Sequence, residues 1–162
     1  MDGVISLVNY ASPIRELVSQ LKYKFTTDLL KEFSDKFMFE KDLVKNKNWT
    51  VLPLPLHHKR QNFRGFNQAE LLGKLVSLKL SLKFDATVLK KTVQTKPQVG
   101  LSKTERKANI SDVFRVAKRI NSENYFLFDD VWTSGASLKS AAGELKKAGA
   151  KTVWGLTLAH PR

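Results

Sequence analysis

The stretch Tyr125–Ser137 constrains the fold of this chain more than any other part of the sequence. Its first four residues are large and apolar, and Asp129 and Asp130 follow them directly. An unbroken apolar run of this length, bounded by polar residues, is typical of a buried strand in a parallel sheet. Beyond a short loop, apolar residues recur at helical spacing as far as Ala148, and Gly149 is expected to end the helix. The sequence therefore predicts a strand–loop–helix unit of an α/β protein.

The loop of this unit combines hydroxyl groups, a glycine and the start of a helix. It consists of Thr133, Ser134, Gly135, Ala136 and Ser137. The N-terminus of a helix presents backbone N–H groups and the positive end of the helix dipole, and both favour an anion. Glycine permits a tight turn and a close approach of the backbone to a ligand. We therefore expect this loop to bind a phosphate monoester through its amides and hydroxyls.

The acidic pair lies too close to this loop to bind the same phosphate. Ionised carboxylates only accept hydrogen bonds, so the natural partners of Asp129 and Asp130 are vicinal sugar hydroxyls, contacted directly or through Mg²⁺. Open α/β sheets bind their ligands at the carboxyl ends of the strands. These features predict a site for a sugar phosphate such as ribose 5-phosphate. The alternative is an ordinary strand–turn–helix corner with a solvated acidic pair.

The excess positive charge is concentrated in the middle of the chain. The net charge is +13, and residues 51–120 carry fifteen of the 28 Lys and Arg residues but only four of the 15 Asp and Glu residues. A solvated basic face, a phosphate-rich ligand and a nucleic acid would each account for this excess.

Length and composition favour one soluble domain. The 162 residues are enough for a single substantial core, so we expect one domain over residues 1–162. The chain contains no cysteine, which excludes disulfides and thiolate metal sites. No apolar run approaches the roughly 20 residues of a membrane-spanning helix, and the first residues lack the features of a signal peptide. A cytoplasmic protein is therefore expected.

The remaining chain alternates between helical and strand patterns. Helices are predicted over Pro13–Phe25, from Thr26 to about Phe39 and from Asn67 to about Leu78; strands are predicted over Trp49–Pro53, Thr87–Lys91, Ile110–Val116 and Lys151–Ala159. The segment Thr92–Asn109 is long, basic and short of large apolar residues, so we expect it to be disordered or to form a functional lid. The expected fold is a mainly parallel sheet flanked by helices, with a flexible lid.

A cationic loop follows the strand Trp49–Pro53 and reaches the same edge of the predicted sheet as Asp129. Its basic residues are Lys59, Arg60 and Arg64. If the aspartates mark a ribose, this loop is the candidate cradle for pyrophosphate. The adjacent His57 and His58 could suggest zinc, but neighbouring residues rarely point at one ion and no third ligand is evident, so no zinc site is expected.

Four segments resemble known families. The stretch Tyr125–Ser137 resembles the phosphoribosyl-pyrophosphate (PRPP) signature of type I phosphoribosyltransferases. Arg64–Leu72 resembles the RGFNQ-type segment of the ComF/GntX proteins, a branch of that fold associated with DNA uptake and natural competence. Thr95–Asn109 is similar to the T-x-x-Q-x-x-L stretch of the same proteins, and Lys22-Tyr23 matches their LKY element. The resemblance implies a type I phosphoribosyltransferase-like fold.

The same resemblance implies an enzyme that transfers a phosphoribosyl group from PRPP, with Mg²⁺, to an acceptor that the sequence does not identify. The 5′-phosphate would bind Thr133–Ser137. The other implied roles are ribose and metal binding for Asp129 and Asp130, pyrophosphate binding for Lys59, Arg60 and Arg64, and closure of the lid for Lys103 and Arg106. Charge on the leaving pyrophosphate needs neutralisation, and closure excludes water.

A second hypothesis is a binding module without catalysis. It would sense PRPP or a nucleotide and serve DNA uptake through protein partners or single-stranded DNA. The basic segment supports this hypothesis, and Phe63, Phe66 and Trp132 could stack on bases, although core packing is the commoner role of such aromatics. Typical ComF/GntX proteins begin with a four-cysteine zinc module, so the contribution of that module is not expected in this cysteine-free chain.

Overall fold

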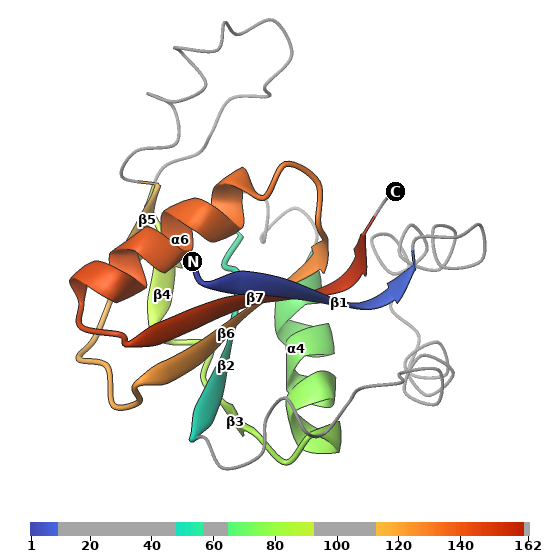
Figure 1. Cartoon of the computed structure of the whole chain (residues 1–162), viewed down its shortest axis with the longest axis horizontal. Coiled ribbons are helices and arrows are strands. Elements are labelled where there is room, and N and C mark those ends of the chain that lie inside the picture. The colour runs from blue at the N-terminus through green and yellow to red at the C-terminus, as the bar shows by residue number, and fades with distance from the viewer. Residues whose placement is uncertain (10–47, 57–64, 93–112, 161–162) are drawn as a thin grey trace, which may run out of the picture.

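The computed structural model describes residues 1–9, 48–56, 65–92 and 113–160 (Figure 1). A five-stranded sheet contains β1 (Gly3–Asn9), β2 (Trp49–Pro53), β3 (Lys83–Phe84), β6 (Asn124–Val131) and β7 (Thr152–His160). A separate two-stranded ribbon contains β4 (Leu89–Lys91) and β5 (Phe114–Val116), and the described helices are α4 (Gln68–Lys79) and α6 (Ala136–Lys147). The helices expected between residues 13 and 39 and most of the expected lid fall outside these ranges.

The five-stranded sheet is parallel throughout, with the strand order β1-β7-β6-β2-β3. The central strand is β6, in which Tyr125–Phe128 are almost inaccessible to solvent. The strand therefore has apolar partners on both faces, which is what its continuous apolar run predicts. The expected α/β fold with a mainly parallel sheet flanked by helices is confirmed.

The two helices cover opposite faces of this sheet (Figure 1). Successive side chains of a strand point to opposite faces. In β6, Phe126 and Phe128 belong to the apolar cluster that contains the buried residues of α4, whereas Tyr125 and Leu127 belong to the cluster that contains those of α6. Each helix thus closes one half of the core. Neither described helix is long and apolar enough to cross a membrane.

Helix α6 ends in the way that its sequence predicts. The Gly149 N–H donates to the carbonyl of Lys146 and the Ala150 N–H donates to that of Leu145, both at 3.0 Å. This pair of bonds, with Gly149 at φ 102°, is a Schellman motif. Because a left-handed residue ends the helix here, the chain turns back at once into β7.

The start of α4 is tied to the end of β2. The side chain of Asn67 accepts a hydrogen bond from the Ala69 N–H at 3.1 Å and donates one to the carbonyl of Leu54 at 3.2 Å. The first bond makes Asn67 the N-cap of α4. The second joins two segments that lie thirteen residues apart in the chain, and it fixes where the helix begins relative to the sheet.

Four strands differ from the prediction. The chain also forms β1 and β3, which the sequence patterns did not predict. The predicted strands Thr87–Lys91 and Ile110–Val116 are seen as the shorter β4 and β5 in the described residues, and they pair with each other in antiparallel fashion rather than joining the main sheet.

Candidate functional site

The connections after β2 and β6 leave the sheet in opposite directions. From β6 the chain crosses through α6 to β7 on one side, and from β2 it reaches β3 on the other side by way of α4. The strands β2 and β6 are neighbours, so their carboxyl ends flank a topological switch point. Open α/β sheets bind their ligands at such a point.

The acidic pair lies at the carboxyl end of β6. Asp129 and Asp130 are both half-buried. An oxygen of Asp129 accepts a hydrogen bond from the Asp130 N–H at 2.9 Å, and an oxygen of Asp130 accepts one from the Val131 N–H at 2.8 Å. Each carboxylate is therefore oriented by the amide that follows it in the chain.

The loop between β6 and α6 leaves its amides available to a ligand. Gly135, the N-cap of α6, has left-handed dihedral angles of φ 67° and ψ 4° and offers no capping side chain. The hydroxyl of Ser134 approaches the Ala136 N–H only to 3.4 Å. The first N–H groups of a helix have no acceptor within the helix, so this corner has the amide donors and dipole that suit an anion. The hydroxyl-bearing residues Thr133, Ser134 and Ser137 are exposed.

The indole ring of Trp132 determines the shape of the loop. A Cβ atom at Gly135 would lie 2.2 Å from Cη2 of Trp132, so only glycine fits below the ring. The half-buried Trp132 packs against the core cluster on the α6 side, and its ring lies 6.5 Å from that of His160 with an interplanar angle of 24°. Sequence reasoning considered Trp132 for base stacking or core packing but missed this contact, because Gly135 lies three residues away and the dihedral angles of the turn decide it.

A small hollow joins the loop to one aspartate. It has a volume of about 40 Å³ and is lined by Asp129 and by every residue from Val131 to Leu138. One water molecule needs about 10–15 Å³ by this measure, so the hollow suits a group of a few atoms, such as one phosphate. Asp130 is not among its lining residues. The structure thus brings Asp129 together with the predicted phosphate loop.

The basic residues predicted to bind pyrophosphate or to close the lid lie in segments that the structure does not describe. Lys59, Arg60 and Arg64 belong to residues 57–64, and Lys103 and Arg106 belong to residues 93–112. The first segment is connected at Leu56 to the end of β2. The Leu54 N–H donates to the carbonyl of Phe128 at 2.8 Å, so the chain enters that segment beside the end of β6.

No group of three or more metal-binding side chains occurs among the described residues. The neighbouring carboxylates of Asp129 and Asp130 are oxygen donors, which suit a hard cation such as Mg²⁺ better than a soft one. Two side chains fall short of a complete coordination shell, so such an ion would take further oxygens from its substrate or from water. His57 and His58 lie in a segment that is not described.

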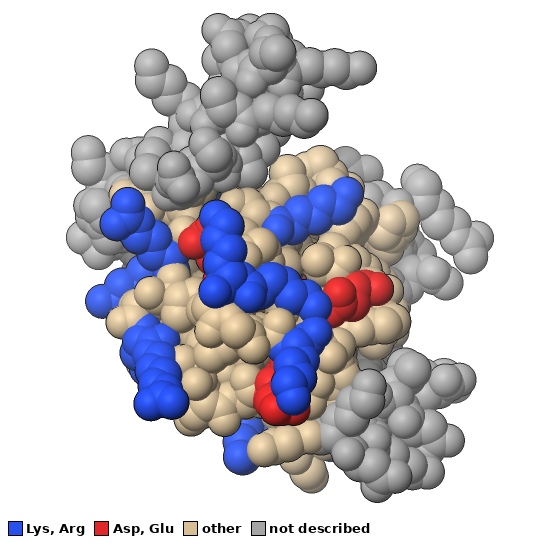
Figure 2. Space-filling model, turned by 60° about the vertical axis from the view of Figure 1, so that its left-hand side comes forward, with Lys and Arg blue, Asp and Glu red and all other residues tan. Residues whose placement is uncertain are grey.

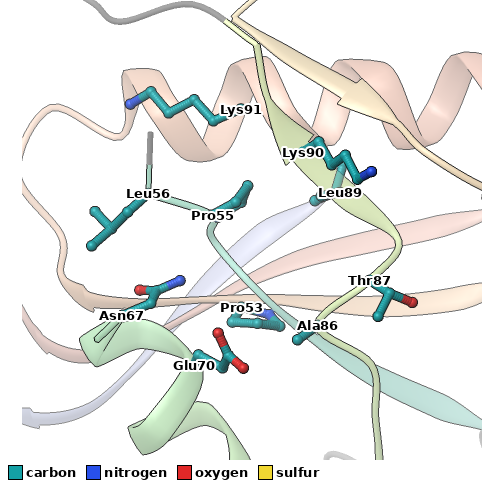
Figure 3. A pocket seen from close by; sticks show the side chains of 10 residues that line it. All are labelled: Pro53, Pro55, Leu56, Asn67, Glu70, Ala86, Thr87, Leu89, Lys90 and Lys91. Atoms are coloured by element: carbon teal, nitrogen blue, oxygen red, sulfur yellow. The ribbon is translucent and has the colours of Figure 1, made fainter. Parts of the chain in front are cut away.

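A larger cavity opens on the β2 side of the switch point (Figure 3). Its volume is about 490 Å³, which lies in the usual range of ligand pockets. Its lining residues come from the end of β2, the start of α4 and the β3–β4 connection with β4: Pro53, Pro55, Leu56, Asn67, Glu70, Ala86, Thr87, Leu89, Lys90 and Lys91. Figure 3 shows the carboxylate of Glu70 directed into this space. Sequence reasoning did not find the cavity, since its walls come from separate segments without a common motif.

An ion pair fixes the chain beside this cavity. Asp85 lies 2.7 Å from the ammonium group of Lys118 and accepts hydrogen bonds from the N–H and hydroxyl of Thr87. Partial burial raises the pKa of Asp85, but the hydrogen bonds from Lys118 and Thr87 outweigh it and hold the pKa below the usual value of an aspartate. Lys118 and Thr87 thus neutralise and hydrogen-bond the Asp85 carboxylate. Through these contacts Asp85 holds the β3–β4 connection in place.

Comparison with known sequences identifies relatives over most of the chain. Competence protein F of Haemophilus influenzae is 37% identical over 178 aligned positions, which cover 98% of this chain and 73% of the relative. Competence protein ComFC of Bacillus subtilis is 31% identical, with 94% of this chain and 62% of the relative covered. DNA utilization protein YhgH of Escherichia coli K12 is 28% identical, with coverages of 93% and 68%. No family model matches.

Solved structures similar to the chain include two phosphoribosyltransferases. A hypoxanthine phosphoribosyltransferase from Staphylococcus aureus has a TM-score of 0.42 at 12% identity. The match covers 91% of this chain and 62% of the chain of that enzyme. An adenine phosphoribosyltransferase from Leishmania tarentolae has a TM-score of 0.43 at 13% identity, with coverages of 83% and 72%.

Proposed function

Because this chain belongs to the ComF family of competence proteins, we propose that it binds PRPP at the carboxyl edge of the sheet between β2 and β6. One observation carries the proposal: Asp129 and the amide-rich loop Thr133–Ser137 line the same small hollow. A carboxylate accepts hydrogen bonds from sugar hydroxyls, and a helix N-terminus binds phosphate. A phosphorylated pentose has both groups.

The proposed binding mode follows from the size and polarity of the hollow. The 5′-phosphate occupies the loop, where the amides at the start of α6 and the hydroxyls of Thr133, Ser134 and Ser137 donate hydrogen bonds to it. The ribose lies beyond the hollow, which is too small for the whole molecule. Its hydroxyls donate to Asp129, with Asp130 beside it at the end of the strand.

The proposed reaction is transfer of the phosphoribosyl group with release of pyrophosphate. The bond between C1 of the ribose and the pyrophosphate oxygen breaks, the oxygen keeps the electron pair, and a nucleophile of unidentified class forms the new bond to C1. Positive charge develops on the sugar, so nearby carboxylates favour this step. Magnesium bound with PRPP supplies charge neutralisation for the pyrophosphate, and Asp129 and Asp130 are the residues that would hold it.

The remaining roles stay predictions from the sequence. Lys59, Arg60 and Arg64 receive pyrophosphate in this proposal, and Lys103 and Arg106 exclude water. The names of the relatives support a cellular role in competence and DNA utilization. In this proposal the protein works in the cytoplasm.

Titration calorimetry with PRPP and Mg²⁺ tests the site. Asp129→Asn keeps an acceptor for the Asp130 N–H but removes the charge, so the fold should persist. We expect PRPP affinity to fall about tenfold to a hundredfold, since hydrogen bonds to charged groups contribute about 1.5–3 kcal/mol. The matched control is Glu123→Gln, which makes the same charge change just before the other end of β6. Equal affinity in the Asp129 variant and the wild type would remove the assignment.

Release of pyrophosphate separates the enzyme from the sensing module. PRPP is incubated with the protein and a panel of nucleobases, amines and nucleotides, and pyrophosphate is measured by a coupled assay. Release that requires Asp129 supports phosphoribosyl transfer. Tight binding of PRPP without release under any of these conditions would favour the module without catalysis.

A further inference from the structure

Two cations face each other across the β4–β5 ribbon. The antiparallel register pairs Lys90 directly with Arg115, and both side chains are exposed. Directly opposite residues have Cβ atoms about 4.5–5.5 Å apart, and like charges in that arrangement oppose pairing of the strands. The ribbon therefore carries a charge pair that works against its own folding. Local features that oppose the fold are expected where a surface has a function.

Several lysines of the described residues pair with acidic side chains. Four lysines near the ribbon or along α6 have acidic partners within 2.6–2.8 Å: Lys118 with Asp85, Lys146 with Asp2, Lys147 with Glu144 and Lys151 with Glu123. Neither Lys90 nor Arg115 forms an ion pair with another described residue. An external anion would remove their mutual repulsion.

The ribbon holds these cations on a rigid support. Its inward-facing Leu89 and Phe114 are buried in the core cluster on the α6 side, together with the neighbouring Val88 and Val113. The Ala117 N–H donates to the carbonyl of Val88 at 2.7 Å, and the Thr92 N–H donates to that of Val113 at 2.9 Å, so the two strands are joined at both ends. Little conformational freedom of the backbone is left to lose when a ligand binds.

The character of this surface suits a nucleic acid better than a protein. Protein interfaces have an apolar centre with aromatic anchors. The large apolar side chain that is exposed among the described residues is Leu78, which belongs to α4 on the other face of the sheet. Figure 2, in which the left-hand side of Figure 1 comes forward, shows Lys and Arg side chains outnumbering acidic ones. Arginine binds phosphate oxygens in a bidentate manner, and two-stranded ribbons are a known element for contacting nucleic acids.

We propose that the outward face of the β4–β5 ribbon binds the phosphodiester backbone of a nucleic acid through Lys90 and Arg115. The two groups converge on one phosphate, or on two neighbouring phosphates, of a single strand. Lys90 also lines the larger cavity, but neither Lys90 nor Arg115 lines the hollow at Asp129, so the proposal does not depend on PRPP binding. Binding through phosphate contacts requires no exposed aromatic residue on the ribbon, so we expect little preference for the base sequence of the nucleic acid.

Fluorescence anisotropy with a labelled oligothymidylate of about 20 nucleotides tests the proposal. Lys90→Glu places a carboxylate opposite Arg115, so it should raise the melting temperature while it weakens binding about tenfold at 0.1 M salt. The slope of log K against log salt should become shallower by about 0.7–1.4, which corresponds to one or two lost phosphate contacts. A loss of affinity with raised stability cannot come from misfolding.

Matched variants and competitors complete the test. Lys74→Glu makes the same charge change at an exposed position of α4 and should leave affinity within about twofold of the wild type. Duplex DNA of equal length shows whether the backbone is read in single or double strands, and binding of either form supports the proposal. Unchanged affinity of Lys90→Glu, an equal loss in Lys74→Glu, or equally tight binding of polyglutamate would overturn it. Calorimetry with PRPP on Arg115→Glu should match the wild type, because Arg115 lines neither the small hollow nor the larger cavity, so the two proposals can fail separately.

Discussion

At the scale of single residues, Gly135 meets two demands that no other amino acid can meet together. Its positive φ lies in the left-handed region, and the ring of Trp132 occupies the space of a side chain. Either demand alone would disfavour a substitution. Together they hold the amides at the start of α6 around the small hollow, so the shape of the loop depends on an aromatic contact as well as on the glycine.

Gly135→Ala should therefore destabilise the protein by at least about 1–2 kcal/mol and weaken PRPP binding, because the loop must move away from the ring. Gly143→Ala is the matched control within the same helix. A methyl group at Gly143 would meet no atom of the described residues within 4 Å beyond its own stretch of helix, and the φ of Gly143 is not positive. There the change should stabilise by about 0.5–1 kcal/mol. Urea denaturation and calorimetry measure both effects, and equal shifts in the two variants would contradict the argument.

The chemistry of the candidate site could be predicted at this scale, but its arrangement could not. The sequence identifies an acidic pair, a hydroxyl-rich loop and a helix start because each is a local pattern. Which carboxylate lines the hollow depends on how the end of β6 is oriented, since successive side chains of a strand point to opposite faces. The structure places Asp129 there. The contact between Trp132 and Gly135 likewise depends on the path of the turn.

At the scale of elements, Asn67 connects the two segments that precede and follow residues 57–64. Its side chain caps α4 and also binds the carbonyl of Leu54 at the end of β2. The two bonds keep the start of the helix at the carboxyl edge of the sheet. Asn67 therefore helps to fix the position of the sheet edge at which a ligand between β2 and β6 would bind.

Asn67→Ala should lower the free energy of unfolding by about 2 kcal/mol or more, because it removes a helix cap and leaves a buried carbonyl without its donor. Asn67→Ser separates the two contributions. Serine still caps the helix, but its hydroxyl is too short to reach Leu54, so an intermediate loss is expected. Thermal denaturation of both variants provides the comparison. A serine variant as stable as the wild type would show that the bond to Leu54 contributes nothing.

The elements that could be predicted are those with a long or continuous pattern. The strands β2, β6 and β7 and the helices α4 and α6 all appear close to their expected bounds. The strand β3 has only two residues, which is too short for any periodicity to show. In β1 the run Val4-Ile5-Ser6-Leu7 contains two β-branched residues, which favour a strand. The side chain of Ser6, which interrupts this run, binds the hydroxyl of Thr157 at 2.8 Å, a partner that only the folded sheet provides.

At the scale of the whole molecule, two ion pairs connect segments that are distant in the chain or in the fold. Asp2 accepts hydrogen bonds from Lys146 and from the Val153 N–H, and these lower its pKa. Asp85 has a lowered pKa for the reasons given above. A carboxyl group whose pKa is lower in the folded state stabilises the fold in its ionised form. Its contribution is complete above the unfolded pKa of about 3.9 and disappears as the pH falls through the folded value.

The protein should consequently lose stability below about pH 4, and part of this loss should come from Asp2 and Asp85. The double variant Asp2→Asn/Asp85→Asn should be less stable at pH 7, by about 1 kcal/mol or less for each partly exposed pair. Its melting temperature should then fall less steeply than that of the wild type as the pH is lowered. Differential scanning calorimetry between pH 7 and 3 measures this slope. Parallel curves for the two proteins would show that neither carboxyl group contributes to the acid transition.

The position of β1 beside β7 has a consequence for biosynthesis. Residues 3–9 leave the ribosome long before residues 152–160, yet they pair with each other, from Gly3 with Trp154 to Asn9 with His160. Folding that depends on such non-local pairing is intrinsically slow. Until β7 has been translated, β1 lacks its partner in the sheet and β6 lacks one of its two. The nascent chain therefore exposes the apolar edge of β1 during most of its elongation, and that of β6 from its synthesis until β7 emerges, so chaperones that protect emerging polypeptides have a target there.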